Sequence, residues 1–470
     1  MRPKTLLVLA ALVAVLVAFV WFIERDLPSS QERVAQARKV VDLEPDAVER
    51  VVIARPEGVI ELVRDPAPAP ANEEGAGQDG PRWGAWRLIQ PLEASADAAA
   101  VDSLVSRLVE LEKKRTLEQV TRDDVGLSEP RAKVTLASGG DETVLEIGAA
   151  IPASRNMTLA VEGLEEVYVV SNSIWSDLAK PAGEWRDKRL FMGNRSDIEQ
   201  VILHRGTERV LLVRRGSVYW VESPLVDRAN EADVNALLSL ISALRAERFI
   251  EETEAAGLEM GLDPPEGSIE VRLADRETTL RIELGAIESE IGNPTRFARV
   301  DSHLVTLVGE LATHLERSAT DWRSRKWATS QVFEIERAVI TDGAGEIEIR
   351  RHNGDWLRDG ERLEYGPATD LLYELTGAEA ERLERAGALT LGAPEVTVRL
   401  EGTQDMSEVL MLYAPQGESV PARSSGREST LLLLPPSVAQ RVVEKIAALR
   451  AAELAPDDEA EPEDAPGDGP

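Results

Sequence analysis

A long internal repeat constrains the fold of this 470-residue chain more than any other feature. Three segments open alike, with "VERVVIAR" from Val48, "IEQVILHR" from Ile198 and "IERAVITD" from Ile335. Each is rich in β-branched residues and has a polar second position, which predicts a short strand. Because self-similarity at a long period is the signature of a repeated structural unit, we expect one domain built three times.

A predicted hairpin follows each opening strand. In the second copy "RVLLVRRGSVYWVE" turns at Arg215-Gly216, and in the third "EIEIRRHNGDWLRD" turns at Asn353-Gly354. The Asn-Gly pair is the dipeptide that best tolerates the positive φ angles of a tight hairpin turn. In the first copy the hairpin contains the Pro-rich stretch "PAPAPANEEGAGQDGP", residues 66–81. We interpret this stretch as a disordered insertion at the tip of the hairpin.

A proline and an amphipathic helix come next. Pro91 and Pro224 are expected to end the preceding strands, and Asp97 and Asn230 to cap the helices. The apolar residues at helical spacing are Val101, Leu104, Val105 and Leu108 in the first copy, Val234, Leu237, Leu238, Ile241 and Leu244 in the second, and a shorter set around Asp370, Leu371, Leu372 and Leu375 in the third. Further strands and a closing helix follow, which predicts an α+β fold with a mostly antiparallel sheet in each copy.

These patterns divide the chain into an amino-terminal segment, three tandem repeats and a tail. The predicted parts are residues 1–26, the repeats 42–191, 197–327 and 332–451, and residues 452–470. The last part is acidic and Pro-rich, and such a composition favours a solvated, disordered tail because it offers little apolar surface to bury.

Residues 1–26 have the pattern of a transmembrane helix. Arg2 and Lys4 precede an uncharged run from Thr5 to Ile23, and about 19 residues of helix nearly span a hydrocarbon core of about 30 Å. The run ends in "FVWFI", without the small residues of a cleavage site. We therefore expect an uncleaved, single-pass anchor in the inner membrane, with its amino terminus in the cytoplasm and the bulk of the chain extracytoplasmic.

One phrase recurs where two repeats meet. "GEWRDKRL" occupies residues 183–190 and "TDWRSRKW" occupies residues 320–327. The binding candidates in these two phrases are Trp185, Arg186, Arg189, Trp322, Arg323 and Arg325, which offer aromatic and guanidinium groups to an anionic glycan or a partner protein. We favour the structural alternative, in which the tryptophan anchors the boundary and the arginines pair with acids of the next repeat.

Composition limits the chemistry that the chain can perform. Its formal net charge of -31 argues against a nucleic-acid partner. The absence of cysteine rules out disulfides and thiolate chemistry. The four histidines lack the helical spacing of metal ligands, and the sequence contains no nucleophile elbow and no phosphate-binding loop. We therefore predict no catalytic residue, no metal and no cofactor.

The order of the motifs is itself informative. An anchor is followed by the "VERVVI" strand, the "WRLIQP" hairpin, the "VGLSEP" turn, the "LEIG" strand and the "VYVV" strand. This pattern resembles the bacterial family called domain of unknown function 4340, over residues 1–191 and again over 197–327, with the third repeat matching in outline. The resemblance implies a membrane-anchored extracytoplasmic protein that accompanies an ABC-type system similar to those named for gliding motility. It implies no functional residue.

Three functional hypotheses follow. The preferred one is a non-catalytic, membrane-anchored accessory or scaffold protein whose partner is an ABC permease or auxiliary subunit. The alternative is a binding module for envelope glycan or another ligand, with grooves between repeats as sites, and clustered exposed aromatic side chains would favour it. An envelope hydrolase is the least favoured, because it requires converging carboxylates of perturbed pKa.

Overall fold

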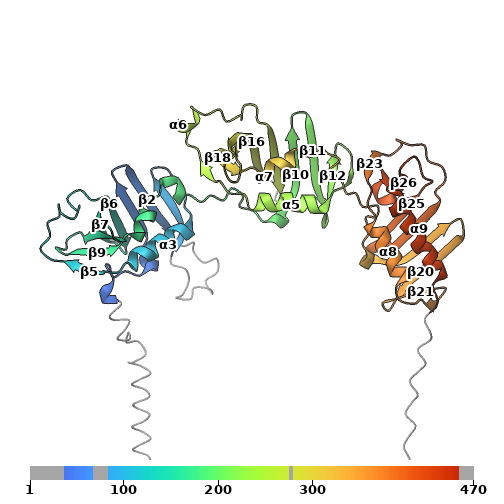
Figure 1. Ribbon diagram of the computed structural model, residues 1–470, viewed down its shortest axis with the longest axis horizontal. Helices are drawn as coiled ribbons and strands as arrows, with labels where there is room; N and C mark the ends of the chain where they lie inside the picture. The colour runs from blue at the N-terminus through green and yellow to red at the C-terminus, as the bar shows by residue number, and fades with distance from the viewer. Residues whose placement is uncertain (1–35, 67–82, 275–278, 455–470) are drawn as a thin grey trace, which may run out of the picture. The chain divides into compact units, whose positions relative to one another are not determined.

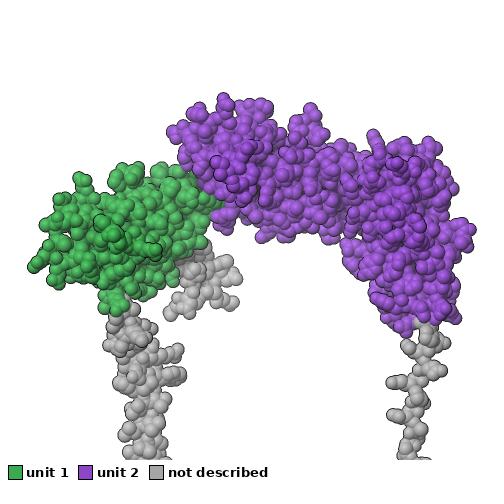
Figure 2. All heavy atoms as spheres, in the orientation of Figure 1, with its two compact units in different colours: residues 1–188 green, residues 189–470 purple. Residues whose placement is uncertain are grey.

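The computed structural model describes residues 36–66, 83–274 and 279–454 (Figure 1). The chain divides into two compact units, Met1–Lys188 with the first repeat and Arg189–Pro470 with the second and third (Figure 2). The predicted membrane helix, most of the predicted insertion and most of the tail lie outside the described residues. Among the residues that are described, no helix is both long and apolar enough to cross a membrane.

Within the residues that the structure describes, each repeat has nine strands. The first has β1 (Arg50–Arg55), β2 (Gly58–Pro66), β3 (Trp83–Gln90), β4 (Ala94–Ser95), β5 (Arg115–Leu117), β6 (Ala132–Ser138), β7 (Asp141–Ala150), β8 (Asn156–Val161) and β9 (Val167–Ser171). The second has β10 (Ile198–Arg205), β11 (Glu208–Arg215), β12 (Val218–Ser223), β13 (Asp227–Arg228), β14 (Arg248–Phe249), β15 (Gly267–Leu273), β16 (Thr279–Ser289), β17 (Thr295–Val300) and β18 (His303–Val308). The third has β19 (Ile335–Asp342), β20 (Gly345–His352), β21 (Asp355–Arg358), β22 (Glu361–Arg362), β23 (Arg382–Arg385), β24 (Val396–Gly402), β25 (Ser407–Leu412), β26 (Val420–Ser424) and β27 (Thr430–Leu434).

The nine strands of each repeat form one sheet. The strand order is β4-β3-β2-β1-β6-β7-β8-β9-β5 in the first sheet, and the second and third sheets follow the same order, from β13 to β14 and from β22 to β23. The paired strands run antiparallel. The predicted repetition of a mostly antiparallel sheet-plus-helix unit is therefore confirmed.

Helices pack on each sheet (Figure 1). The long helix after the fourth strand is α3 (Ala98–Val109) in the first repeat, α5 (Glu231–Ser242) in the second and α8 (Pro367–Gly377) in the third. The closing helices are, in the same order, α4 (Trp175–Leu178), α7 (Glu310–Leu315) and α9 (Pro436–Ala451). The second repeat has an additional short helix, α6 (Glu252–Ala255). The predicted caps are confirmed, because Asp97 accepts a hydrogen bond from the Ala100 amide and Asn230 accepts one from the Ala232 amide. Helix α8 has 11 residues against 12 in α3, so it is hardly shorter.

Three separate hydrophobic cores lie between these helices and sheets. The predicted apolar stripes of α3, α5 and α8 are buried in them. The cores begin at other residues than the predicted repeats, however. Val40 already belongs to the first core, Phe191 to the second and Trp327 to the third. The second and third cores therefore begin within residues assigned to the preceding repeat, and the first core begins just before its predicted limit at residue 42.

Close backbone approach explains the "VGLSEP" and "MGLDPP" turns. The Ala149 amide donates to the Val125 carbonyl, and the Ala286 amide donates to the Met260 carbonyl, both at 2.8–2.9 Å. A Cβ atom on Gly285 would lie 2.1 Å from the Met260 oxygen, so only glycine fits there. The loop thereby covers part of the outer face of the sheet. The weaker "TLGAP" segment of the third repeat has no such glycine opposite it.

Several features differ from the sequence predictions. Three strands of each repeat were not predicted: the short edge strands β4 and β5, the inner strand β8, and their equivalents. Pro66 belongs to β2, where it pairs with Trp83, and not to the insertion. The predicted Asn353-Gly354 turn is present, with φ angles of +49° and +93° between the paired His352 and Asp355.

Candidate functional site

The two WR phrases close the first and second repeats. Trp185 is fully buried in the first core and Trp322 in the second. Their carbonyls accept 2.8 Å hydrogen bonds from the amides of Asp97 and Asn230, the residues that cap helices α3 and α5. Each phrase therefore ends one repeat by closing onto the start of that repeat's long helix. The second tryptophan of "TDWRSRKW", Trp327, is already buried in the third core.

The third repeat is closed in the same way by residues that had been assigned to the disordered tail. The Glu364 amide donates to the Glu453 carbonyl, and Leu363 pairs with Leu454 in an isolated bridge. These contacts repeat those of Asn230 with the second WR phrase. The predicted disordered tail, residues 452–470, is therefore corrected for residues 452–454. Their backbone closes the third repeat as the WR phrases close the first two, although no tryptophan is present there.

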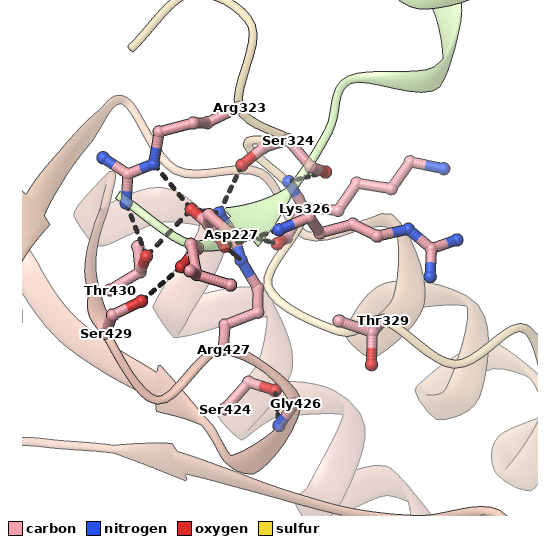
Figure 3. A network of polar contacts seen from close by, with 12 residues as sticks. Asp227, Arg323, Ser324, Lys326, Thr329, Ser424, Gly426, Arg427, Ser429 and Thr430 are labelled. Atoms are coloured by element: carbon pink, nitrogen blue, oxygen red, sulfur yellow. Dashed lines mark hydrogen bonds and ion pairs between the residues drawn. The ribbon is translucent and has the colours of Figure 1, made fainter. Parts of the chain in front are cut away.

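A buried ionic network lies where the second repeat meets the third (Figure 3). The Asp227 carboxylate on β13 accepts hydrogen bonds from Arg427 Nε and Nη2, both at 2.7 Å. It also accepts one from Arg323 Nε at 2.7 Å and one from Thr430 Oγ1 at 2.8 Å. Arg427 and Thr430 belong to the third repeat. All four side chains are buried, and Asp227 is 0% exposed.

The charges in this network are almost fully satisfied by protein groups. Arg427 also donates to the backbone carbonyls of Ser324 and Lys326 in the WR phrase. Burial opposes ionisation of Asp227, but hydrogen bonds to Arg427 and the positive charges of Arg427 and Arg323 outweigh it and hold the pKa of this carboxyl below its usual range. An ionised Asp227 thus ties β13, the WR phrase and the connection before β27 together.

Two residues of this network, Asp227 and Arg427, have no counterpart in the repeat before their own, whereas Arg323 has one in Arg186 of the first WR phrase. Ala94 in β4 is the counterpart of Asp227 in β13. Each lies two residues before an alanine, Ala96 or Ala229, whose amide donates to the strand before it. The hairpin between β17 and β18 has only Asp301 and Ser302 between its paired ends. In the third repeat the matching connection is longer and carries Arg427 in a 3-10 turn.

A second buried carboxylate fixes the connecting segment after Trp327. Glu408 on β25 is 2% exposed and accepts hydrogen bonds from the Thr329 amide at 2.9 Å and the Ser330 amide at 2.9 Å. The hydroxyls of Ser330 and Ser424 also donate to it. The segment that links the two repeats is therefore held to the sheet of the third repeat by its backbone.

A cleft of about 910 Å³ opens beside this joint, within the second compact unit. Its walls come from the start of α5, the linking segment 324–333, the β20–β21 hairpin and helix α8. Four aromatic side chains line it, namely Phe333, Trp356, Tyr365 and Tyr373. Three of these are largely exposed, with Phe333 at 69%, Tyr365 at 96% and Tyr373 at 63%. Aromatic side chains this exposed are typical of binding surfaces.

The charged residues of the cleft are mostly basic. Arg228, Arg325, Lys326 and Arg351 line it, against the acids Glu231 and Glu379. Arg228 is paired with Glu231 at 2.7 Å. Arg325, Lys326 and Arg351 are exposed. The arrangement suits an extended ligand that carries negative charge and has flat or ring-shaped groups to pack on aromatic faces.

The six binding candidates predicted from the sequence lie in different environments in the structure. Trp185 and Trp322 are buried in the first and second cores, and Arg323 is buried in the network around Asp227. Arg325 lines the cleft, while Arg186 and Arg189 lie in the first WR phrase with at least part of their surface accessible. The arginines of the WR phrase were predicted to pair with acids of the next repeat. Instead the acid, Asp227, belongs to the second repeat, and Arg427 of the third repeat pairs with it alongside Arg323.

Sequence reasoning missed the residues that matter most here. Asp227 and Arg427 are 200 positions apart, so no local pattern joins them. Tyr373 carried a usable signal, because it lies outside the apolar stripe of α8 and must point away from the core. Among the described residues, no group of three or more histidine or acidic side chains is placed to hold a metal ion.

Comparison with protein families gives two overlapping matches to one model, described as Domain of unknown function (DUF4340), at residues 86–259 and 220–394. Each match starts near the hairpin tryptophan of one repeat and ends in the next, so it is offset from the limits 1–191 and 197–327 on which the resemblance was based. A comparison with curated proteins found no match. Since the two matches together span residues 86–394, more than half of the sequence, the chain belongs to the DUF4340 family.

Proposed function

We propose that this chain is a non-catalytic, membrane-anchored, extracytoplasmic accessory or scaffold protein, associated with an ABC-type transport system. The observation that supports the proposal best is the joint around Asp227, which combines the second and third repeats into one block. A surface that is held in one arrangement loses less conformational entropy when a partner binds. Two repeats locked together are therefore better suited to present such a surface than two that move independently.

The other supports are the anchor-like amino terminus and the repeated architecture. A tether at the membrane raises the effective concentration of the repeats near neighbouring membrane proteins, so that individually weak contacts suffice. The net charge of -31 keeps an array of this size soluble and disfavours self-association. The partner in this proposal is an ABC permease or auxiliary subunit.

Affinity purification from mildly solubilised membranes tests this proposal. The full chain and a variant lacking residues 1–26 are compared by quantitative mass spectrometry, with circular dichroism to show that the variant is folded. The proposal predicts that a permease and its ATPase accompany the full chain and are lost with the anchor. Absence of both from the full-chain sample would contradict an ABC-linked role, and their retention by the anchorless variant would contradict tethering.

The second candidate function is a binding module for an envelope glycan or a similar ligand, and the aromatic-lined cleft is the specific observation that favours it. Sugar rings pack on exposed aromatic faces, and the cleft adds basic groups for acidic sugars. Binding of soluble envelope-glycan fragments should be weakened at least tenfold by Tyr365→Ala together with Tyr373→Ala. Ile291→Ala, at a residue that is 92% exposed and does not line the cleft, is the matched control.

A further inference from the structure

The cleft between the second and third repeats has an unusual charge for this protein. Its lining contains four basic and two acidic residues, whereas the whole chain has 53 basic and 84 acidic residues. With Glu231 already paired to Arg228, the exposed Arg325, Lys326 and Arg351 give the cleft a positive character. An acidic ligand is therefore attracted to this surface and repelled by most of the others.

The chain itself supplies a segment with the complementary composition. Residues 455–470 contain seven acidic residues, four prolines and no basic residue. A Pro-rich segment favours an extended conformation with little entropy left to lose, and such segments bind grooves lined with aromatic side chains. Carboxylates pair with exposed arginines, which accept them in bidentate geometry.

The place where the described chain ends puts this segment close to the cleft. Leu454 pairs with Leu363, and the Glu453 carbonyl accepts a hydrogen bond from the Glu364 amide. Tyr365, which is 96% exposed and lines the cleft, is the next residue along the chain. A segment of 16 residues can extend by about 50 Å at roughly 3.3 Å per residue, so residues 455–470 have ample reach.

We propose that residues 455–470 bind in the cleft of their own chain, with carboxylates on Arg325, Lys326 and Arg351 and prolines on the rings of Tyr365, Tyr373 and Phe333. This inference rests on the second candidate function, because it requires the cleft to be a binding site, and it adds a regulator of that site. Attachment next to the cleft gives the segment a high effective concentration. An external acidic ligand must then displace it, so the segment sets the ligand concentration at which the cleft is filled.

The test uses the chain shortened to end at Leu454, which keeps the pairing with Leu363, and a fluorescent synthetic peptide of residues 455–470. We expect the peptide to bind the shortened chain and to bind the full chain at least tenfold more weakly, because there the attached segment competes. A peptide with every Asp changed to Asn and every Glu to Gln should bind at least tenfold more weakly than the acidic one. Added salt should also weaken binding of the acidic peptide to the shortened chain, because it screens the charges.

Matched variants locate the binding surface. Arg351→Glu combined with Lys326→Glu should weaken peptide binding at least tenfold, whereas Arg209→Glu, at an exposed residue of the second repeat outside the cleft, should leave it within about twofold. Hydrogen exchange adds a readout in the intact protein: peptides that cover Tyr365 and Tyr373 should exchange more slowly in the full chain than in the shortened one.

Two results would overturn the inference. If the peptide does not bind the shortened chain and hydrogen exchange is unchanged by the truncation, residues 455–470 do not occupy the cleft. Binding of acidic glycan fragments to the full and the shortened chain shows whether only the regulator fails or the binding module fails as well. Fragments that bind both chains equally, and lose binding in Tyr365→Ala with Tyr373→Ala, would leave the cleft a binding site without this regulator. If no probe binds, the regulator and the binding module both fail.

Discussion

Replacing Asp227 by asparagine removes the negative charge that Arg323 and Arg427 share and leaves these two buried arginines facing each other. The carboxylate is 0% exposed and accepts four hydrogen bonds from side chains and one from the Arg228 amide, so water cannot readily replace it. Removing one partner of a buried charge network typically costs about 3–5 kcal/mol, because the charge left behind is uncompensated. We expect Asp227→Asn to destabilise the joint by an amount in this range.

Hydrogen exchange measured by mass spectrometry suits this prediction, because unfolding of a multidomain chain has no single free energy. In the linking segment beside the network, the Ser324 amide donates to the Arg228 carbonyl of the second repeat and the Trp327 amide to the Ala378 carbonyl of the third. A loss of about 3 kcal/mol corresponds to exchange more than about a hundredfold faster. Peptides from the first repeat should be unchanged.

Two further variants make the prediction refutable. Asp370→Asn breaks an ion pair with Lys445 in which both side chains are exposed, and such pairs contribute at most about 1 kcal/mol, so exchange should hardly change. Asp227→Asn combined with Arg427→Met removes one of the two stranded charges and should recover part of the protection. If Asp227→Asn leaves the exchange of Ser324 and Trp327 unchanged, the network does not hold the repeats together.

Acid should weaken the same joint. The pKa of Asp227 is lower in the folded protein than its usual value of 3.8, so the unfolded chain binds this proton more readily. The stabilisation is therefore complete above about pH 5 and is lost as the pH falls through the folded-state pKa. Exchange of the Trp327 amide, corrected for the intrinsic effect of pH, should accelerate below about pH 4 in the native protein but not in Asp227→Asn.

The remaining predictions concern the core of the second repeat and the start of the third. Burial lowers the pKa of His314, whose ring lies 5.8 Å from that of Trp322, so lowering the pH from about 7.5 to about 5.5 should destabilise helix α7, and His314→Gln should abolish most of that dependence in hydrogen exchange. Gly285→Ala should cost about 1–3 kcal/mol by overpacking in thermal unfolding of the second compact unit. Gly257→Ala should not, because its Cβ atom would make only an ordinary 3.7 Å contact with the Glu254 oxygen. Trp327→Ala should cost about 3–5 kcal/mol in the third repeat, and an unchanged midpoint would show that this side chain does not anchor the repeat.

The repeated fold could be predicted from the sequence because hydrophobic periodicity and turn residues are local signals. The opening strands, the Asn353-Gly354 turn and the capped helices all follow from patterns within about 15 residues. The two-residue strands β4 and β13 exist only because the chain pairs there with its neighbour, and no propensity marks them.

The Asp227 network and the cleft could not be predicted from local patterns, because their residues are far apart in the sequence. The WR phrases were recognised as boundaries, but the sequence does not show that Trp322 and Trp327 enter different cores. Asp227 looked like one of many surface acids until the fold placed Arg427 against it. The aromatic residues of the cleft come from a linker, a hairpin and a helix, so only the tertiary structure brings them together.

Pulsed electron paramagnetic resonance between two spin labels tests most directly whether the second and third repeats form one block. The chain has no cysteine, so Ala236→Cys on α5 and Val443→Cys on α9, both at exposed residues, provide unique labelling sites. We expect a single narrow distance distribution in the otherwise native chain and a broad one after Asp227→Asn. A broad distribution in the native chain would contradict the rigid joint on which the proposed scaffold rests.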